Sequence, residues 1–316
     1  MRVAVLDDYQ HKAAQLADWD SLSAEIDFFH APISDLVMTL AAYDVLVLMR
    51  ERTKFSAETL AALPNLKLVV TTGMRNASLD VGHLHDRGVP VSGTGIPNYG
   101  AGQGVASTVE IAWGLIFATR KRVVAEDRLL RQGVWQAEMP VNLAHSTLGL
   151  VGLGRLGSQM VAPAKAFGME VLAWSQNLGA ERAGELGAQR VGFGELLAYS
   201  DVVSIHLVLS ERTRGLFGAA QLEAMKPGAS LINTSRGPIV EEAALLDALR
   251  RGRISAGLDV FDQEPLPPGH SLTALDNAVL TPHLGYVSEE ALAGMYAEAV
   301  EDIAAFQAGT PIRLVS

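Results

Sequence analysis

Arg236, Glu264 and His283 are ionisable residues in the last third of the chain, and each stands beside a glycine or a proline. Each follows a short apolar run of the kind that forms a buried strand, and strand ends are where ligands bind in open α/β sheets. A guanidinium can bind a substrate carboxylate through two hydrogen bonds. An imidazole can exchange a proton with a substrate oxygen, and a carboxylate can orient that imidazole and favour its protonated form. Together these residue types predict a site for hydride transfer to or from a small acid.

Each of the three residues also has a structural alternative. Arg236 could be a surface arginine that caps a helix, Glu264 a loop carboxylate before a proline, and His283 a turn residue after a proline. The Ser-Arg-Gly sequence directly after a buried strand favours the functional interpretation of Arg236 most strongly.

A glycine-rich turn of the form GxGxxG follows the apolar residues 148–151 and precedes a helical pattern over residues 158–167. In such a turn the first glycine permits a tight bend, the second lets the backbone approach a pyrophosphate, and the third lets the helix pack close to the strand. The N–H groups at the start of the helix then face the phosphates. The motif alone is a weak signal, but the strand before it and the helix after it favour a dinucleotide site. The predicted contacts are Gly152, Gly154, Arg155, Leu156 and Gly157.

The choice between NAD and NADP depends on the end of the second strand of this domain. An acid there usually binds the ribose 2′-hydroxyl of NAD. Here residues 170–174 are followed by Ser175 and Gln176, so the acid is missing. No arginine replaces it, and the nearest candidates for a 2′-phosphate are Arg155 and Arg182. Both cofactors therefore stay open, with a slight preference for NAD.

Short β-branched runs alternate with helical patterns along the chain, which predicts parallel sheets with helices on both faces. The predicted strands are residues 3–6, 45–48, 66–71, 90–92, 147–151, 170–174, 202–205, 230–233, 255–258 and 278–280. The predicted helices are residues 11–19, 34–41, 56–63, 79–87, 105–121, 123–132, 158–167 and 288–308.

A glycine-rich stretch over residues 92–104 interrupts this alternation and predicts a crossing between two α/β domains. A chain of 316 residues is also long enough for two domains. We expect one domain to comprise residues 1–98 plus 286–316, and the other to comprise residues 99–285.

The composition narrows the possible partners. The formal net charge is −10 at pH 7, and an acidic chain repels a polyphosphate backbone, so nucleic acid is not an expected partner. The chain has no cysteine, which excludes disulfides, thiolate nucleophiles and cysteine metal sites, and no metal is predicted. No apolar run approaches the roughly 18 residues of a membrane span, and the N-terminal apolar run is too short for a signal peptide. We therefore expect a cytoplasmic protein without membrane spans.

The sequence resembles the D-isomer-specific 2-hydroxyacid dehydrogenase family over essentially its whole length. The resemblance implies two doubly wound parallel-sheet domains, a Rossmann-type cofactor domain inserted in a flavodoxin-like substrate domain. It also implies an oxidoreductase that moves a hydride between a nicotinamide cofactor and a small D-2-hydroxy acid or 2-keto acid. The motifs that carry it are residues 152–157, 206–213, 225–228, 233–237, 258–265 and 281–285.

Roles for individual residues follow from this resemblance. Arg236 would bind the substrate carboxylate and carbonyl, and His283, paired with Glu264, would be the acid/base. Asp259 would contact the nicotinamide carboxamide. His206 stands at a strand end, where we favour a structural role facing the cofactor. The implied cofactor contacts beyond the glycine turn are Ser175, Gln176, His206, Thr213, Thr234, Asp259, His283 and Gly285.

The resemblance also implies substrate contacts at Arg52, Gly73, Met74, Arg75 and Tyr286. Most members of the family carry a smaller residue where Arg75 stands, and many carry glycine where Tyr286 stands. These departures leave the size and charge of the substrate open. Residues 129–135, with Trp135, are expected at a dimer contact or in the core. In the family the corresponding helices mediate dimerisation, so a homodimer through the cofactor domain is expected.

A cofactor-sensing binding protein of the same fold is the alternative from another functional class, because some corepressors share the arginine, glutamate and histidine. Those proteins usually carry extra interaction tails. Formate dehydrogenases are disfavoured because they have glutamine where this chain has Glu264. Long phosphoglycerate dehydrogenases are disfavoured because the chain ends at Ser316.

Overall fold

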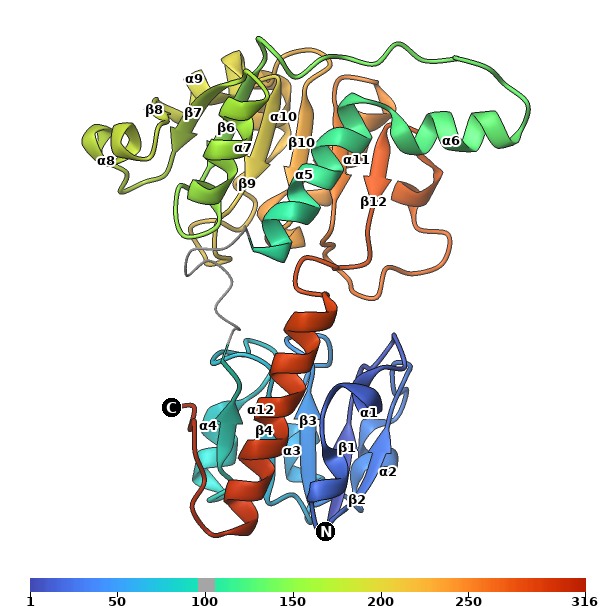
Figure 1. Cartoon of the computed structure of the whole chain (residues 1–316), viewed down its shortest axis with the longest axis vertical. Coiled ribbons are helices and arrows are strands. Elements are labelled where there is room, and N and C mark those ends of the chain that lie inside the picture. The colour runs from blue at the N-terminus through green and yellow to red at the C-terminus, as the bar shows by residue number, and fades with distance from the viewer. Residues whose placement is uncertain (96–105) are drawn as a thin grey trace. The chain divides into compact units, whose positions relative to one another are not determined.

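The computed structural model describes residues 1–95 and 106–316. Residues 1–95 and 287–316 belong to one compact unit, unit 1, and residues 106–286 belong to a second, unit 2 (Figure 1). The chain thus passes from unit 2 back into unit 1 directly after Tyr286. Unit 1 is therefore discontinuous in sequence, with unit 2 between its two parts.

Of the two predicted domain boundaries, one lies within the described residues and the other does not. The boundary predicted between residues 285 and 286 stands one residue before the change of unit. The boundary predicted between residues 98 and 99 lies outside the described residues. Ser92 and Gly93, which open the predicted glycine-rich crossing, belong to a strand.

Unit 1 contains a parallel sheet with the strand order β2-β1-β3-β4-β5. The order reverses between β1 and β3, as in flavodoxin-like folds. The strands are β1 (Arg2–Val5), β2 (Glu25–Phe28), β3 (Val45–Leu48), β4 (Leu68–Thr71) and β5 (Val91–Gly93). The helices are α1 (Ala13–Leu16), η1 (Trp19–Ser21), α2 (Leu36–Leu40), α3 (Ala57–Ala61), α4 (Val81–Asp86) and α12 (Glu289–Gln307).

Every residue of the central strands β3 and β4 is buried, which is typical of parallel strands covered on both faces. The C-terminal helix α12 packs against β4 and α1 (Figure 1). Side-chain caps set the starts of several helices: Ser56 accepts a hydrogen bond from the Thr59 N–H, and Ser288 accepts one from the Ala291 N–H.

Unit 2 contains a parallel sheet with the strand order β12-β11-β10-β9-β6-β7-β8. The order reverses between β6 and β9, which is the Rossmann arrangement. The strands are β6 (Thr147–Val151), β7 (Glu170–Trp174), β8 (Gln189–Arg190), β9 (Val202–Ile205), β10 (Ser230–Asn233), β11 (Ser255–Leu258) and β12 (Ala278–Leu280). The helices are α5 (Ser107–Arg120), α6 (Val123–Arg131), η2 (Gly157–Met160), α7 (Val161–Ala166), α8 (Ala180–Glu185), α9 (Phe193–Tyr199), α10 (Ala219–Ala224), η3 (Gly237–Ile239), α11 (Glu242–Arg250) and η4 (Ser271–Ala274).

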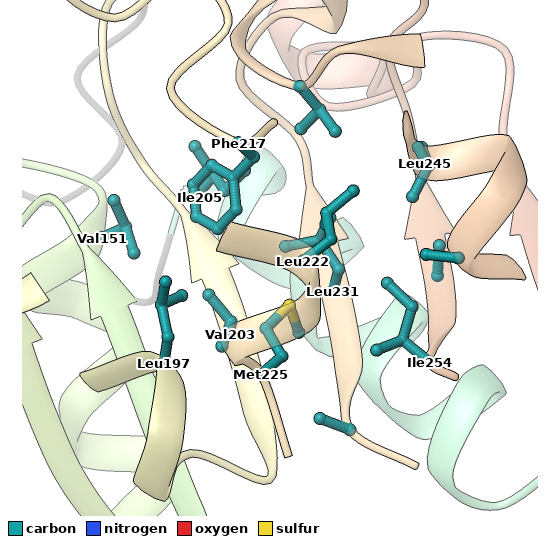
Figure 2. Close-up of a cluster of buried hydrophobic side chains, with 14 of the residues drawn as sticks. Val151, Leu197, Val203, Ile205, Phe217, Leu222, Met225, Leu231, Leu245 and Ile254 are labelled. Carbon is teal, nitrogen blue, oxygen red and sulfur yellow. The ribbon is translucent and has the colours of Figure 1, made fainter. Parts of the chain in front are cut away.

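The core of unit 2 holds the carboxyl ends of its central strands in place. Helices α9, α10 and α11 cover one face of the sheet, and their apolar side chains pack onto β9, β10 and β11. Helix α5 packs on β10 and β11, close to Gly257, where a Cβ would lie 2.8 Å from the Cβ of Leu115. Figure 2 shows the apolar cluster between helices α9, α10 and α11 and the sheet, with labels on Val151, Leu197, Val203, Ile205, Phe217, Leu222, Met225, Leu231, Leu245 and Ile254.

The predicted fold class, two doubly wound α/β domains with parallel sheets, is confirmed. Strands β2 and β8 were not predicted. Among the described residues, no helix is both long and apolar enough to cross a membrane. The same part of the chain holds no group of three or more histidine, aspartate or glutamate side chains arranged to bind a metal ion.

Candidate active site

The turn that carries Arg236 follows β10 and is fixed by hydrogen bonds from its neighbours. Asn233 at the end of β10 accepts a bond from the Ser235 N–H at 3.0 Å and donates its amide to the Arg236 carbonyl at 2.9 Å. The Ser235 hydroxyl donates to the carbonyl of Ile205, the last residue of β9, at 2.8 Å. The next residue, Gly237, lies so close to the Phe261 backbone that any Cβ would collide with it. The half-buried Arg236 is thus held in one position at the strand ends.

Asp259 follows β11 and is completely buried. One carboxylate oxygen accepts bonds from the Thr281 hydroxyl at 2.6 Å and the Leu284 N–H at 2.7 Å, and the other accepts one from the Gly285 N–H at 2.8 Å. Burial raises the pKa of Asp259, and these hydrogen bonds act against that rise. The contacts make Asp259 the anchor of the loop that carries His283. A direct contact with the nicotinamide carboxamide stays a prediction.

His283 and Glu264 form a hydrogen-bonded pair in the loops after β12 and β11. His283 Nδ1 lies 2.6 Å from Glu264 Oε2, and the two side chains are 19% and 26% exposed. The other oxygen, Glu264 Oε1, accepts a bond from the Phe261 N–H at 2.9 Å. His283 has a φ of 54°, a left-handed conformation that non-glycine residues adopt rarely and that often marks functional sites. With Nδ1 bound to the carboxylate, Nε2 is the nitrogen that can meet a substrate.

The pKa of Glu264 lies below its usual value. Burial alone would raise this pKa. The hydrogen bond and the charge of His283 lower it, and the Phe261 N–H and the Arg236 charge add smaller effects in the same direction, so that together they outweigh burial. Glu264 is therefore ionised over the whole physiological range. The ring of Tyr286 lies edge-on to that of His283, with centroids 5.4 Å apart. Tyr286 thus borders the imidazole, and its contact with a substrate stays a prediction.

Because β10, β11 and β12 are neighbours in the sheet, their carboxyl ends bring together all three residues that the sequence singled out. The influence of the Arg236 charge on Glu264 independently indicates that these side chains are close. A cation for a carboxylate and a proton donor held by an anion can together bind and protonate a keto acid.

The three glycines of the turn after β6 differ in the space around them. Gly152 has a φ of +104°, and a Cβ there would collide with the His206 backbone. Gly157 packs against the Gly152 carbonyl so closely that no side chain fits. By contrast, a Cβ on Gly154 would meet nothing within 4 Å, so open space lies above the backbone where a pyrophosphate must approach. Arg155 is exposed and Leu156 half-buried in the same turn.

The helix after the glycine turn differs from the prediction. Residues 157–160 form the 3₁₀ turn η2, and only then does α7 begin. The Gln159 N–H donates to the Leu156 carbonyl, three residues back, at 3.0 Å, which is the spacing of a 3₁₀ turn. The predicted α-helix over residues 158–167 was therefore wrong in its first turn.

Ser175 and Gln176 follow β7, at the place where the ribose was predicted to bind. Arg212 Nη1 donates to the Gln176 side-chain oxygen at 3.5 Å. His206 follows β9, the strand at the reversal point of the sheet, and its Nε2 lies 2.9 Å from the Ser204 hydroxyl. Burial lowers the pKa of His206 to about 4, so the ring is neutral at physiological pH. This fits the predicted structural role better than proton transfer.

Thr213 and Thr234, two predicted cofactor contacts, differ in the hydrogen bonding of their hydroxyl groups. Thr213 closes its own loop, because its hydroxyl accepts a bond from the Ser210 N–H and donates to the Val208 carbonyl, both at 2.8 Å. The Thr234 hydroxyl is buried and has no hydrogen-bond partner among the described residues. A buried hydroxyl normally has a partner, so Thr234 fits a contact with a bound molecule.

The predicted substrate contacts of unit 1 follow β3 and β4. Arg52 donates to the Asp7 carbonyl at 2.8 Å, and its guanidinium stacks over the Tyr9 ring. Gly73 has a φ of +109°. The next residues on the loop, Met74 and Arg75, are exposed.

Sequence reasoning named the charged residues but missed those that hold them, chiefly Asn233, Ser235 and Thr281. The signal for Asn233 is its place at a strand end before a turn, where asparagine commonly bonds to the backbone two residues on. No pattern in the sequence points to Thr281, because its partner lies 22 residues away.

A Rossmann sheet with an open glycine turn, and a histidine, glutamate and arginine at adjacent strand ends, defines the class of nicotinamide-dependent oxidoreductases. Residues 113–285 match the family model described as D-isomer specific 2-hydroxyacid dehydrogenase, NAD binding domain. The chain belongs to the D-isomer-specific 2-hydroxyacid dehydrogenase family, as the sequence resemblance implied.

Individual relatives support the same assignment. The chain is 33% identical to the D-3-phosphoglycerate dehydrogenase of Archaeoglobus fulgidus, covering 99% of this chain but only 58% of that protein. It is 38% identical to the glyoxylate reductase of Aeropyrum pernix, covering 83% of this chain and 80% of that one. A crystal structure of a phosphoglycerate oxidoreductase from Vibrio cholerae matches with a TM-score of 0.89 at 32% identity, covering 98% and 100% of the two chains.

Proposed function

We propose that this protein interconverts a small 2-keto acid and the corresponding D-2-hydroxy acid, with Arg236 binding the carboxylate and His283 as the acid/base. The observation that carries the proposal is the 2.6 Å hydrogen bond between His283 Nδ1 and Glu264 Oε2. A first test is a steady-state assay with NADH and glyoxylate, the acid in the name of the Aeropyrum pernix relative. Oxidation of NADH that depends on the keto acid is expected. Binding of NADH without turnover of glyoxylate or any other 2-keto acid in a panel would contradict the proposal.

The nicotinamide, when bound, supplies the hydride for keto-acid reduction and accepts it in the reverse reaction. Arg236 holds the substrate carboxylate by two hydrogen bonds and polarises the neighbouring carbonyl. As C2 becomes tetrahedral, His283 transfers the proton on Nε2 to the developing alkoxide. The Nδ1–H of His283 stays hydrogen-bonded to Glu264. The carboxylate stabilises the imidazolium before the transfer and fixes the orientation of the ring. In oxidation the same nitrogen removes the hydroxyl proton.

Other residues position these groups. Asp259 holds the backbone of Leu284 and Gly285, which fixes His283 relative to the sheet. We propose that Tyr286 borders the substrate, since its ring lies against that of His283. In unit 1, Arg52 and the Gly73–Met74–Arg75 loop are the proposed substrate contacts.

We propose that the pyrophosphate binds at Gly152, Gly154, Arg155, Leu156 and Gly157, and that the ribose lies near Ser175 and Gln176. The further proposed contacts are His206, Thr213, Thr234, Asp259, His283 and Gly285. With no acid after β7, both NADH and NADPH bind, and NADH is slightly preferred. Ser175→Asp places a carboxylate at the ribose, which repels a 2′-phosphate.

The Ser175→Asp variant is therefore expected to raise the NADH/NADPH ratio of kcat/KM by ~10-fold, about 1.4 kcal/mol. The dissociation constants of the two reduced cofactors, measured by calorimetry without a keto acid, should change in the same direction. Ser175→Asn is the matched control, because it adds a similar volume without the charge. If both variants leave the NADH/NADPH ratio of kcat/KM and the ratio of the two dissociation constants unchanged, residue 175 does not face the ribose.

We also propose that the protein forms a homodimer through unit 2. All residues of α6 are described, and none of them is buried, although the helix carries Val124 and Leu130, each 55% exposed. The segment after it exposes Trp135 by 76% and Met139 by 89%. An exposed apolar patch of this kind marks an interface more often than a free surface. A second copy of the chain is the occupant that the family resemblance implies.

Sedimentation velocity tests the dimer. The parent protein is expected at twice the chain mass of 33.6 kDa. Trp135→Asp combined with Met139→Asp should shift the mass to that of one chain, because each charge would be buried without a partner. Tyr199→Asp, at another exposed aromatic residue of unit 2, serves as control and should stay dimeric. A parent that is monomeric at tens of micromolar would contradict the proposal.

A further inference from the structure

The loop that carries Glu264 leaves the sheet after β11 and returns to the core at η4. We call residues 259–272 the glutamate loop. Its first half is fixed by its own hydrogen bonds: Asp259 accepts three, and the Phe261 N–H donates to Glu264 Oε1 at 2.9 Å. Phe261 is also buried in the core of unit 2. Glu264 is therefore held firmly from the side of β11.

The second half of the glutamate loop reaches Glu264 from the other side. Pro265, Pro267 and Pro268 restrict the backbone over this stretch. The His270 N–H donates to the Pro267 carbonyl at 3.1 Å, which closes the stretch into a turn. Because so few backbone angles are free to adjust, a displacement of His270 is transmitted to Glu264.

The ring of His270 makes two hydrogen bonds. Nδ1 accepts one from the Leu272 N–H at 3.3 Å, which caps η4, and Nε2 lies 3.2 Å from Glu242 Oε1 at the start of α11. A backbone N–H only donates and a carboxylate only accepts, so the two bonds together require the neutral ring with its proton on Nε2. Both side chains are half-buried. The bond between His270 and Glu242 thus links the glutamate loop to helix α11.

Charged groups from three segments surround this bond. Glu242 belongs to α11, Asp262 to the glutamate loop, and Arg214 to the connection between β9 and α10. Burial and the Glu242 charge raise the pKa of Asp262, while the charges of Arg214 and His270 lower it. These influences indicate that His270 and Glu242 lie close to Asp262, two residues before Glu264.

Packing alone does not fix the glutamate loop against α11. A cavity of about 20 Å³ lies between them, lined by Phe261 and Asp262 of the loop and by Glu242 and Leu245 of the helix. Side chains that line a cavity lack contacts on one side, so the loop could shift there at little cost. A directional hydrogen bond from His270 to Glu242, which lines the same cavity, restricts that shift.

We propose that His270, through its bond to Glu242, positions the glutamate loop so that Glu264 meets His283. This inference rests on the proposed function, in which His283 is the acid/base. His270 is a positioning residue that acts through Glu264, while proton transfer stays with His283.

Two substitutions of His270 separate its two hydrogen bonds. Asparagine keeps an acceptor for the Leu272 N–H but is too short to reach Glu242, whereas glutamine reaches Glu242 with its amide and loses the cap. His270→Asn should lower kcat/KM for keto-acid reduction by ~10-fold at neutral pH, the effect of one hydrogen bond to a charged group. It should also move the high-pH limb of reduction to lower pH. His270→Gln should stay within about threefold of the parent, with the limb in place.

Glu242→Ala breaks the same bond from the other side and should match His270→Asn. Glu195→Ala, at an exposed acid in the first turn of α9, is the control and should leave kcat/KM and the limb unchanged. In a Glu264→Ala background, His270→Asn should change kcat/KM by less than about twofold, because the carboxylate through which it acts is gone. The full loss in that background, or equal losses in His270→Asn and His270→Gln, would overturn the inference.

Hydrogen exchange of the Phe261 amide tests the inference without turnover, because this N–H is bonded to Glu264 Oε1. The exchange rate, measured by mass spectrometry with fragmentation to single residues, should be ~10-fold higher in His270→Asn and unchanged in His270→Gln. If no keto acid is reduced but this difference is seen, the proposed function fails and the positioning role stands. If keto acids are reduced but the Phe261 amide exchanges alike in the parent and both variants, the positioning role fails and the function stands.

Discussion

Replacing Arg236 by lysine lowers kcat/KM for every accepted 2-keto acid by at least ~100-fold, about 2.7 kcal/mol of transition-state stabilisation. Lysine keeps the positive charge but loses the planar fork that bonds to a carboxylate through two nitrogens. Asn233 and Ser235 hold the turn through their own side chains, and the guanidinium adds one bond, from Arg236 Nη1 to the Ser235 carbonyl at 2.7 Å. The variant loses the geometry of that bond, so the integrity of the turn is checked separately.

Arg250→Lys is the control for this substitution, since it makes the same chemical change on the surface of α11 and should leave kcat/KM unaltered. Unchanged far-ultraviolet circular dichroism and cofactor affinity in Arg236→Lys would show that the fold and the glycine turn are intact. A variant within about a factor of three of the parent would remove Arg236 from the mechanism.

Replacing Glu264 by glutamine moves the high-pH limb of keto-acid reduction to lower pH. The pKa of Glu264 lies below its usual value because of the bond and charge of His283, so the carboxylate is ionised throughout the working range. By reciprocity, the same interaction stabilises the protonated imidazole. Reduction consumes the proton of that imidazole. Glutamine removes the negative charge that stabilises it, so we expect the limb to shift to lower pH.

The loss should be greatest at neutral to alkaline pH, where kcat/KM for reduction should fall by ~10- to 100-fold, the range for a hydrogen bond to a charged group. Oxidation requires the neutral imidazole, so its low-pH limb should also move down. The measurement is kcat/KM for reduction between about pH 5 and pH 9 in both proteins. Asp262→Asn, at an exposed acid in the same loop, should leave the limb in place. A limb that stays or moves upward in Glu264→Gln would mean that Glu264 does not act through His283.

The sequence predicted the fold well where strands are buried and apolar. The runs at β3, β6 and β10 are buried at nearly every residue and are bounded by turns, and the predicted limits match the structure. β2 was missed because it is an edge strand whose sequence, Glu-Ile-Asp-Phe, alternates charge with apolar residues and leaves no residue fully buried. β8 was missed because it is only two residues long and exposed.

The charged residues of the site could be predicted from the sequence, but the hydrogen bonds that hold them in place could not. Strand ends placed Arg236, Glu264 and His283 at one edge, because neighbouring parallel strands end together. The three hydrogen bonds that Asp259 accepts come from residues 22 to 26 positions away, and no local spacing encodes such contacts. The 3₁₀ turn after the glycine motif differs from an α-helix in a bond such as that from the Gln159 N–H to the Leu156 carbonyl, which a helical pattern of apolar residues does not reveal.

Transfer of deuterium from NADH labelled at C4 tests the central claim most directly. The protein would be mixed with labelled NADH and a panel of 2-keto acids that includes glyoxylate and 2-oxoglutarate. The products would be analysed by mass spectrometry and proton NMR spectroscopy. Deuterium is expected at C2 of a D-2-hydroxy acid, one atom for each NADH oxidised, when NADH labelled on the transferred face is used. The same label should be nearly absent from the product of Arg236→Lys over the same time. Tight binding of NADH with no labelled hydroxy acid from any member of the panel would contradict the account and favour a cofactor-sensing protein.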